Sequence, residues 1–270
     1  MRRLTILLTA LTTLVVGIPA TAQAVAPLPT SMSAVGDSIT RGFDATPWGC
    51  FLSDCPHHSW ATGTSTSVDS HYERLLRMSP GIKGRVWNDA KTGAKMVHLA
   101  GQLATVAARD VGYVTVAMGA NDVCTSSPST MTPVATFTDQ FRGALLAYTS
   151  TDAQAQLFVA SIPNVYQLWS LLRSRASGTW RTFGICQSML SSANTEATRQ
   201  LVLQRVKDLN SALATVCGEF VQCRWDGGAT FDTAFTTADV STVDYFHPSL
   251  AGQAKLANRT WPEAVKAWQG

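Results

Sequence analysis

Three polar clusters place a serine, an asparagine and a histidine at widely separated points of this chain. They are Gly36–Thr40 (Gly-Asp-Ser-Ile-Thr), Gly119–Asp122 (Gly-Ala-Asn-Asp) and Asp244–Pro248 (Asp-Tyr-Phe-His-Pro). A serine hydroxyl becomes an effective nucleophile when a neighbouring base takes its proton during attack. Histidine suits that task because an ordinary imidazole has a pKa of ~6.5, close to neutral pH. These residue types point to acyl transfer, provided that the fold brings them together.

Each member of the clusters can be given a chemical role. Ser38 supplies the nucleophile and His247 supplies the base. Asp244 lies three residues before His247, so its carboxylate can reach back to the second ring nitrogen and fix the tautomer. Asp239 is a rival for that role, and a backbone carbonyl could also orient the ring.

A tetrahedral intermediate also needs hydrogen-bond donors for its oxyanion, each worth on the order of 10²–10³ in rate. The side-chain amide of Asn121 can be one such donor. Backbone N–H groups of Ser38 and of a glycine can be the others.

The elements that must position these residues alternate between short apolar runs and longer helical ones. The pattern predicts strands at Ser31–Val35, Arg85–Asn88, Tyr113–Met118, Leu157–Ser161 and Phe220–Arg224. It predicts helices near His71–Met78, Met96–Ala108, Thr136–Tyr148, Thr195–Val216 and Leu250–Trp268, the last kinked or broken at Pro262. Strands that alternate with helices predict an α/β fold, with a parallel sheet covered on both faces in three layers. Ligands in such sheets bind beyond the carboxyl ends of the strands, where the three clusters are expected.

Gly-Asp-Ser-Ile near the start, Gly-x-Asn-Asp in the middle and Asp-x-x-His-Pro near the end resemble the motifs of the GDSL, or SGNH, hydrolase family. The motifs occur in the family's order between Ser38 and His247. The resemblance implies a flavodoxin-like α/β/α sandwich and a carboxylic ester hydrolase with a Ser-His-Asp triad. It also implies an oxyanion hole formed by Ser38, Asn121 and a glycine of a second block. Asn88–Ala94 is similar to that block, so Gly93 is the candidate. No cofactor and no metal are expected.

The first 24 residues have the pattern of a secretory signal peptide. Arg2 and Arg3 precede an apolar run from Leu4 to Ile18, and small-residue cleavage patterns end at Ala24 and Ala26. We therefore expect residues 1–24 to be removed and residues 25–270 to form a single hydrolase domain, secreted to the extracellular space. An uncleaved membrane anchor is the alternative, but the apolar run is shorter than the ~20 residues of a transmembrane helix.

The net charge argues against nucleic acid as a partner. The whole chain has 21 basic and 18 acidic residues, and without Arg2 and Arg3 the balance falls to 19 against 18, or +1. Nucleic-acid binding needs a concentrated basic patch. We expect a small-molecule or lipid ester as substrate, a transient contact with a lipid surface, and a monomer.

Six cysteines in an exported chain predict disulfides, with 15 possible connectivities. Two pairs are close in sequence, and pairing each locally leaves a long-range pair. The resemblance supports this arrangement, because secreted actinobacterial members of the family usually pair cysteines consecutively. A metal site among Cys50, Asp54, Cys55, His57 and His58 is the alternative, although its spacing fits no familiar zinc pattern. The local pairing joins Cys50 to Cys55 and Cys217 to Cys223, and leaves Cys124 for Cys186.

The substrate is less clearly indicated than the chemistry. The segment Pro163–Trp169 follows the fourth predicted strand, so Val165, Tyr166, Leu168 and Trp169 could line an acyl pocket or form a lipid-facing patch. The same residues could instead pack on the core at the start of a helix. We favour a lipid or general carboxylic ester, including phospholipid. The alternatives are a carbohydrate O-acetyl esterase and a non-catalytic secreted binding module with the same fold.

Overall fold

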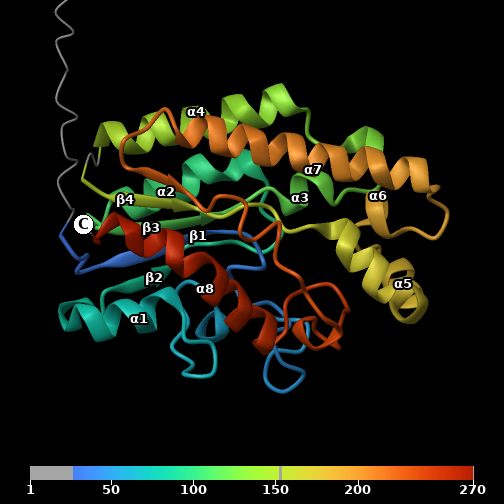
Figure 1. Cartoon of the computed structure of the whole chain (residues 1–270), viewed down its shortest axis with the longest axis horizontal. Helices are drawn as coiled ribbons and strands as arrows, with labels where there is room; N and C mark the ends of the chain where they lie inside the picture. Colours follow the sequence, from blue (N-terminus) through green and yellow to red (C-terminus); the bar gives the residue numbers. More distant parts are fainter. Residues whose placement is uncertain (1–26, 152–153, 270) are drawn as a thin grey trace, which may run out of the picture.

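A five-stranded parallel sheet forms the centre of the computed structural model, which describes residues 27–151 and 154–269 (Figure 1). The expected signal segment, residues 1–24, lies outside the described residues. The strands are β1 (Met32–Gly36), β2 (Val86–Asn88), β3 (Tyr113–Ala117), β4 (Gln156–Val159) and β5 (Cys223–Trp225).

The order of the strands across the sheet is β2-β1-β3-β4-β5, and all neighbouring pairs are parallel. β1 and β3 are therefore adjacent, with Val35 opposite Val116 and Gly36 opposite Ala117. Their carboxyl ends lie side by side. This adjacency brings the cluster that follows β1 next to the cluster that follows β3, although 81 residues separate Gly36 from Ala117 in the chain.

Helices cover both faces of the sheet (Figure 1). α2 (Leu99–Ala107), α4 (Val134–Thr151) and α7 (Glu196–Cys217) pack together on one face. α1 (His71–Met78) and α8 (Leu250–Ala264) lie on the other face. The fold is thus the three-layer α/β sandwich that the alternation of strands and helices predicted.

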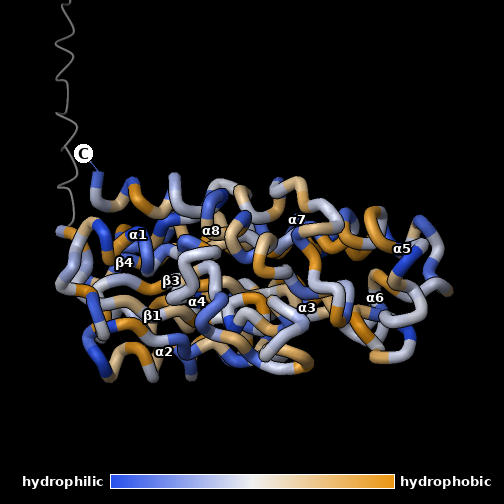
Figure 2. Tube along the Cα trace, turned by 90° about the horizontal axis from the view of Figure 1, so that it is seen from below, coloured by the Kyte–Doolittle hydropathy of each residue, from blue (hydrophilic) through white to orange (hydrophobic). Residues whose placement is uncertain are grey.

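The sheet separates two buried apolar clusters, one under each helical layer. β1 contributes to both, because Met32 and Ala34 face the α1/α8 layer whereas Val35 faces the α2/α4/α7 layer. The hydrophobic segments accordingly run along the inner layers in Figure 2, with hydrophilic segments toward the outside. Such alternation along a strand follows from its two-residue repeat.

Two helices extend past the carboxyl ends of the strands and were not among the predicted elements. They are α5 (Val165–Thr182) and the short α6 (Gln187–Leu190) (Figure 1). A break of the last helix at Pro262 is wrong, because α8 continues through Pro262 to Ala264 before a 3₁₀ turn follows. Pro262 cannot donate a backbone hydrogen bond to the preceding turn, and the α-helix ends two residues later, at Ala264.

Three disulfides join Cys50 to Cys55, Cys124 to Cys186 and Cys217 to Cys223. The long-range one, Cys124–Cys186, ties the segment after α5 to α3 (Ala120–Val123). Within residues 27–151 and 154–269, no helix has the length and apolar character that crossing a bilayer requires.

Candidate active site

The turn after β1 presents Ser38 at the carboxyl edge of the sheet. Gly36 makes this turn possible: its φ is +152°, and a Cβ at that position would collide with the carbonyl oxygen of Ala117 on the adjacent strand. The carboxylate of Asp37 accepts a hydrogen bond from the N–H of Ile39 at 2.9 Å, which closes the turn around Ser38. A buried carboxylate without a cationic partner is costly. Burial, supported by the nearby charge of Asp122, raises the pKa of Asp37 from 3.8 to about 6, against the hydrogen bond from Ile39 and the charge of His247.

Two buried glutamines hold this turn from opposite helical layers. Gln102 of α2 accepts from the N–H of Gly36 at 2.7 Å and donates to its carbonyl oxygen at 2.9 Å. Gln253 of α8 donates to the carbonyl oxygen of Ile39 at 2.9 Å. Because both backbone and side-chain groups are paired, the turn is fixed relative to both layers.

The loop before α8 holds His247 opposite the turn. Asp244 Oδ1 accepts the N–H groups of Phe246 at 2.9 Å and His247 at 3.1 Å, which folds the loop back on its own carboxylate. Tyr245 takes a left-handed conformation with φ of 55°. A backbone hydrogen bond also joins the two ends of this loop to each other, since the N–H of Ser241 donates to the carbonyl oxygen of His247 at 2.8 Å.

Ser38, His247 and Asp244 form one continuous hydrogen-bonded chain. His247 Nε2 lies 2.7 Å from Ser38 Oγ, and His247 Nδ1 lies 2.5 Å from Asp244 Oδ2. Ser38 and Asp244 are nearly buried, at 6% and 5% exposure. Burial alone would raise the pKa of Asp244, but the hydrogen bond from His247, its charge and the two backbone N–H groups together lower it. The carboxylate is therefore kept ionised beside the imidazole, as an orienting group requires.

Asp239, the rival orienting residue, lies near the same loop but makes other contacts. Its Oδ2 accepts hydrogen bonds from the backbone N–H of Thr236 at 2.7 Å and from its hydroxyl at 2.8 Å, and it pairs with Lys255. Asp239 thus caps a 3₁₀ turn and neutralises a lysine, while Asp244 is the carboxylate bonded to the imidazole.

Gly93 and Asn121 face Ser38 across the same cleft. Asn121 Nδ2 donates one hydrogen bond to the carbonyl oxygen of Ala94 at 3.0 Å, so its second N–H is left for a ligand. In the part of the chain that the structure describes, no protein acceptor pairs with the backbone N–H of Ser38 or Gly93. These three groups have free hydrogen-bonding capacity on one side of the serine, which is the arrangement an oxyanion needs.

The buried carboxylate of Asp122 joins the segment that contains Asn121 to the loop that contains Gly93. Its Oδ2 accepts from the N–H of Met96 at 2.9 Å, and its Oδ1 accepts from the hydroxyl of Thr132 at 2.7 Å. Burial raises the pKa of Asp122 against these two hydrogen bonds. Through this residue the loop that contains Gly93 is positioned by the segment that contains Asn121.

The cleft above Ser38 has a volume of about 340 Å³ and a largely apolar lining. Phe43 and Phe246 flank the imidazole, with ring centroids 4.9 and 5.0 Å from that of His247. Further out, Leu52 and Phe183 are 49% and 59% exposed at the rim. An open apolar rim around a buried polar centre suits a substrate with an apolar acyl group.

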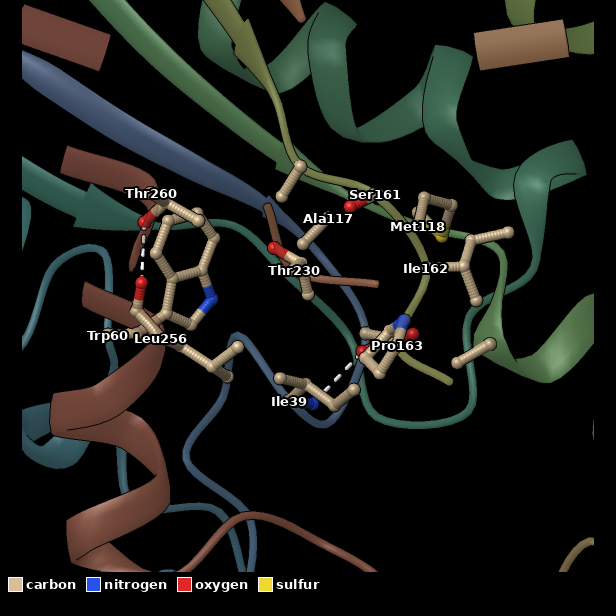
Figure 3. A pocket seen from close by; sticks show the side chains of 13 residues that line it. Ile39, Trp60, Ala117, Met118, Ser161, Ile162, Pro163, Thr230, Leu256 and Thr260 are labelled. Atoms are coloured by element: carbon tan, nitrogen blue, oxygen red, sulfur yellow. Dashed lines mark hydrogen bonds between the residues drawn. The ribbon is translucent and has the colours of Figure 1, made fainter. Parts of the chain in front are cut away.

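Two smaller pockets adjoin the turn. One, of about 60 Å³, lies on the other side of His247 and includes Val165 and Leu168 at the start of α5. The other, of about 20 Å³, lies behind Ile39, with Trp60 and Ile162 in its wall, and contains neither Ser38 nor His247 (Figure 3).

The segment Pro163–Trp169 therefore combines both roles considered from the sequence. Val165 and Leu168 border a pocket beside His247. Tyr166 instead donates its hydroxyl to Glu196 at 2.7 Å, and Trp169 packs under the guanidinium of Arg199. Val165 and Leu168 thus face the site, whereas Tyr166 and Trp169 connect α5 to α7.

Several residues of the site were missed by the sequence analysis, including Phe43, Asp44 and the segment Phe183–Cys186. Pairing Cys124 with Cys186 was a usable signal for that segment, because Cys124 lies three residues after Asn121. Asp44 carried no such signal, since its neighbour Asp244 is 200 residues away.

Among the residues that the structure describes, two groups of side chains have the composition of a metal site. Cys50, Cys55 and His57 form one group, but the two sulfurs are joined in a disulfide and are not thiolate ligands. Asp44, Asp244 and His247 form the other, in which His247 is already hydrogen-bonded to Asp244 through one ring nitrogen and to Ser38 through the other.

The model of the family described as GDSL-like Lipase/Acylhydrolase matches residues 32–260, most of the 270-residue chain. No curated protein matches the sequence significantly.

Solved structures with the same fold share little sequence with this chain. The extracellular lipase of Streptomyces rimosus is 18% identical over 86% of this chain and 99% of its own, with a TM-score of 0.52. A protein of Parabacteroides merdae described as a GDSL-like lipase is 17% identical over 88% and 95%, with a TM-score of 0.55. The acetylxylan esterase Axe2 of Geobacillus stearothermophilus is 15% identical over 89% and 94%, with a TM-score of 0.51. At these identities the likeness establishes the fold.

Proposed function

We propose, since this chain belongs to the GDSL-like lipase/acylhydrolase family of carboxylic ester hydrolases, that it cleaves acyl esters through a covalent acyl-enzyme on Ser38. His247 acts as general base and acid, and Asp244 orients it. The observation that carries the proposal is the 2.7 Å contact between Ser38 Oγ and His247 Nε2, two residues 209 positions apart in sequence.

In the first half-reaction, Ser38 Oγ attacks the ester carbonyl carbon while His247 Nε2 takes the hydroxyl proton. The carbonyl oxygen becomes an oxyanion, which the N–H groups of Ser38, Gly93 and Asn121 receive. The carbon–oxygen bond to the alcohol then breaks, and the imidazolium returns its proton to the leaving oxygen. The alcohol departs and the acyl group stays on Ser38.

In the second half-reaction, water repeats the attack. His247 takes a proton from water as it adds to the acyl carbon, and the same donors stabilise the second oxyanion. The bond to Ser38 Oγ breaks, the proton returns to the serine, and the carboxylic acid leaves. Asp244 remains ionised throughout and stabilises the imidazolium.

The lining of the cleft supports an ester with an apolar acyl chain as substrate, either a lipid or a simple ester, and phospholipid is included. Phe43, Leu52, Phe183 and Phe246 offer apolar surface within reach of Ser38. A carbohydrate O-acetyl ester would need polar contacts for its sugar, and the cleft rim supplies few.

A substrate panel tests this proposal. Purified protein lacking residues 1–24 is expected to hydrolyse p-nitrophenyl butyrate and octanoate and to release little acetate from acetylated xylan. Ser38→Ala and His247→Ala should each reduce turnover by at least ~10³-fold while the melting temperature changes little, because neither side chain carries the fold. Preferential release of acetate from xylan would reverse the substrate assignment. Activity retained by both variants would contradict the proposed roles of Ser38 and His247.

Secretion and the monomeric state belong to the same proposal. The three disulfides and the basic-apolar start of the chain support export. Expression of the full chain in an export-competent host should give an extracellular protein whose first residue follows Ala24 or Ala26, as read by intact mass. Size-exclusion chromatography with light scattering should give the mass of one chain.

A further inference from the structure

Asp44 is a second carboxyl group beside the proposed triad, and it takes no part in the two half-reactions. Its side chain is fully buried, at 0% exposure, in the loop that follows the nucleophile turn. An oxygen of Asp44, an oxygen of Asp244 and a ring nitrogen of His247 all lie within 4.8 Å of one another. Asp44 also lines the cleft that contains Ser38.

The local backbone fixes Asp44 in this place. Its φ of 55° lies in the left-handed region, which aspartate and asparagine tolerate better than most residues. Asp44 Oδ1 accepts the N–H of Leu52 at 2.5 Å, and the N–H of Asp44 donates to the carbonyl oxygen of Ser53 at 3.2 Å. The disulfide Cys50–Cys55 closes the loop that provides both partners.

The second oxygen of Asp44 has no stabilising donor. Asp44 Oδ2 is buried, and among the described residues no hydrogen-bond donor faces it. The ionisable groups that face the carboxyl are Asp244 and His247. Two neighbouring buried carboxylates repel each other, so one of them binds a proton more tightly than an isolated carboxyl does.

Burial and then the negative charge of Asp244 raise the pKa of Asp44 from 3.8 to about 6, while the N–H of Leu52 and the charge of His247 oppose the change. The pKa of Asp244 moves down instead, because His247 bonds to it directly. The proton of the pair therefore resides chiefly on Asp44.

We propose that Asp44 is a positioning residue for ester hydrolysis: it shares a proton with Asp244 in acid, and loss of that proton places a second negative charge beside the His247 imidazolium. The inference depends on the function proposed for Ser38 and His247. In the protonated pair, the O–H of Asp44 donates to the carboxylate of Asp244 and partly neutralises it. When the proton leaves to solvent, two carboxylates stabilise the imidazolium that forms as Ser38 attacks.

Asp44→Asn isolates this effect. Asparagine fits the left-handed backbone, accepts the N–H of Leu52 and donates an amide hydrogen to Asp244, but it cannot ionise. Asp44→Gly also fits the backbone and removes donor and charge together. Asp110→Asn is the matched control, because Asp110 has a φ of 51° and is exposed away from the cleft.

The kcat/KM of the wild type and the Asp44→Asn variant should be nearly equal at pH 5. At pH 8 the wild type should be faster by roughly three- to tenfold, the effect of one nearby charge partly screened by solvent. Asp44→Gly should also lack the gain in kcat/KM between pH 5 and pH 8, because glycine cannot ionise either. The ratio of kcat/KM between the wild type and the Asp110→Asn variant should not depend on pH. A ratio of wild type to Asp44→Asn that is constant from pH 5 to 8 would overturn the proposal.

Melting temperatures give a readout that needs no catalysis. A carboxyl with a raised folded pKa stabilises the fold fully below its unfolded pKa of 3.8, and this contribution is lost as the pH rises through about 6. The melting temperature of Asp44→Asn minus that of the wild type should therefore increase between pH 4 and pH 7. The carboxyl ¹³C resonance of Asp44 in labelled wild type should show the same titration without a substitution.

The two measurements separate the two proposals. An active wild type with a constant rate ratio and a constant difference in melting temperature would overturn the role of Asp44 alone. A wild type without esterase activity would overturn the reaction proposed for Ser38 and, with it, the role of Asp44, even if the melting temperatures followed the expected titration.

Discussion

Asn121 is a proposed oxyanion donor that a substitution can remove without changing the backbone. Asn121→Ala should lower kcat by on the order of 10²–10³ and change KM little, because the amide acts mainly on the charge that develops in the transition state. Steady-state kinetics on a p-nitrophenyl ester would measure both constants. Asn121→Asp is a stringent companion, since a carboxylate would repel the oxyanion and should be slower still. A rise in KM with unchanged kcat would show that Asn121 binds substrate rather than the transition state.

At the scale of single residues, the sequence contained enough information to select Ser38, Asn121 and His247. Ser38 and Asn121 each follow an apolar run, His247 precedes the last predicted helix, and the order of the three motifs in the chain added to the signal. The sequence favoured Asp244 over Asp239 because of its three-residue spacing to His247, but it could not exclude Asp239, since the difference lies in how the loop folds back. Asp44 could not be identified as a site residue for a similar reason. An aspartate in a loop is an ordinary turn residue, and the sequence does not show that Asp244 lies beside it.

Gly119 shows how strictly one element of the site is constrained. Its φ is +123°, and a Cβ there would lie 2.5 Å from Ile162 Cδ1. Gly119→Ala should therefore lower the free energy of unfolding by roughly 2–4 kcal/mol and also reduce kcat, because α3 carries Asn121.

Gly143→Ala is the control for this prediction. Gly143 lies within α4, where a Cβ would meet nothing within 4 Å. Alanine in a helix interior is favoured over glycine by about 1 kcal/mol, so this variant should be slightly more stable and fully active. Chemical denaturation of both variants measures the contrast, and equal stabilities would contradict it.

The disulfide Cys124–Cys186 holds one wall of the cleft as well as the fold. Replacing both cysteines with serine should lower stability by roughly 2–5 kcal/mol. It should also raise KM for p-nitrophenyl octanoate, because Phe183 and Ile185 are tied to α3 through this bridge. Replacing Cys217 and Cys223, which lie outside the cleft lining, should lower stability without changing KM. Identical KM values for the two double variants would contradict the role of the bridge in substrate binding.

At the scale of elements, the apolar patterns located all five strands to within a few residues and α1 with its observed bounds. α5 was missed although its signals are present. Asn164 caps it by accepting the N–H of Gln167 at 3.1 Å, and its buried residues Val165, Leu172, Ala176 and Trp180 recur at helical spacing. Arginines and serines between those positions weakened the pattern, since the helix extends beyond the sheet and buries a narrow stripe.

For the whole molecule, His71 couples stability to pH. Its ring is fully buried, with Nδ1 2.9 Å from the hydroxyl of Tyr113 and Nε2 2.8 Å from that of Thr260. Burial, with a smaller contribution from the charge of Arg74, lowers the pKa of His71 from 6.5 to about 3. Between these two values the unfolded chain binds a proton that the folded chain does not. Stability is therefore complete above pH 6.5 and is lost as the pH falls, by about 3 kcal/mol at pH 4.

Comparing the wild type with His71→Gln isolates the effect of His71 on the pH dependence of stability. Asp37 and Asp44 are present in both proteins, and their raised pKa values make the fold more stable at low pH, opposite to the effect of His71. The wild type should exceed the variant in unfolding free energy by most at pH 7, and the difference should shrink toward pH 4. Urea titrations at several pH values measure it. A difference that stays constant with pH would contradict the assigned pKa.

The layered α/β architecture could be predicted from the sequence, because alternating strands and helices have few ways to bury both faces of a sheet. The strand order could not be predicted from the local patterns, because none of them states that β1 lies between β2 and β3; it was implied only by the resemblance to a family with a flavodoxin-like sandwich. Yet that order is what places Ser38 beside Asn121 and opposite His247. The lining of the cleft could not be predicted either. Part of it comes from the segment after α5, which the disulfide between Cys124 and Cys186 brings next to α3.

The most direct test of the central claim is labelling with a serine-directed fluorophosphonate, followed by intact mass and peptide mapping. The wild type should give a single adduct on Ser38, and His247→Ala should form it at least ~10²-fold more slowly, because the imidazole must take the hydroxyl proton. An adduct on another serine, or equal labelling rates in the two proteins, would contradict that claim.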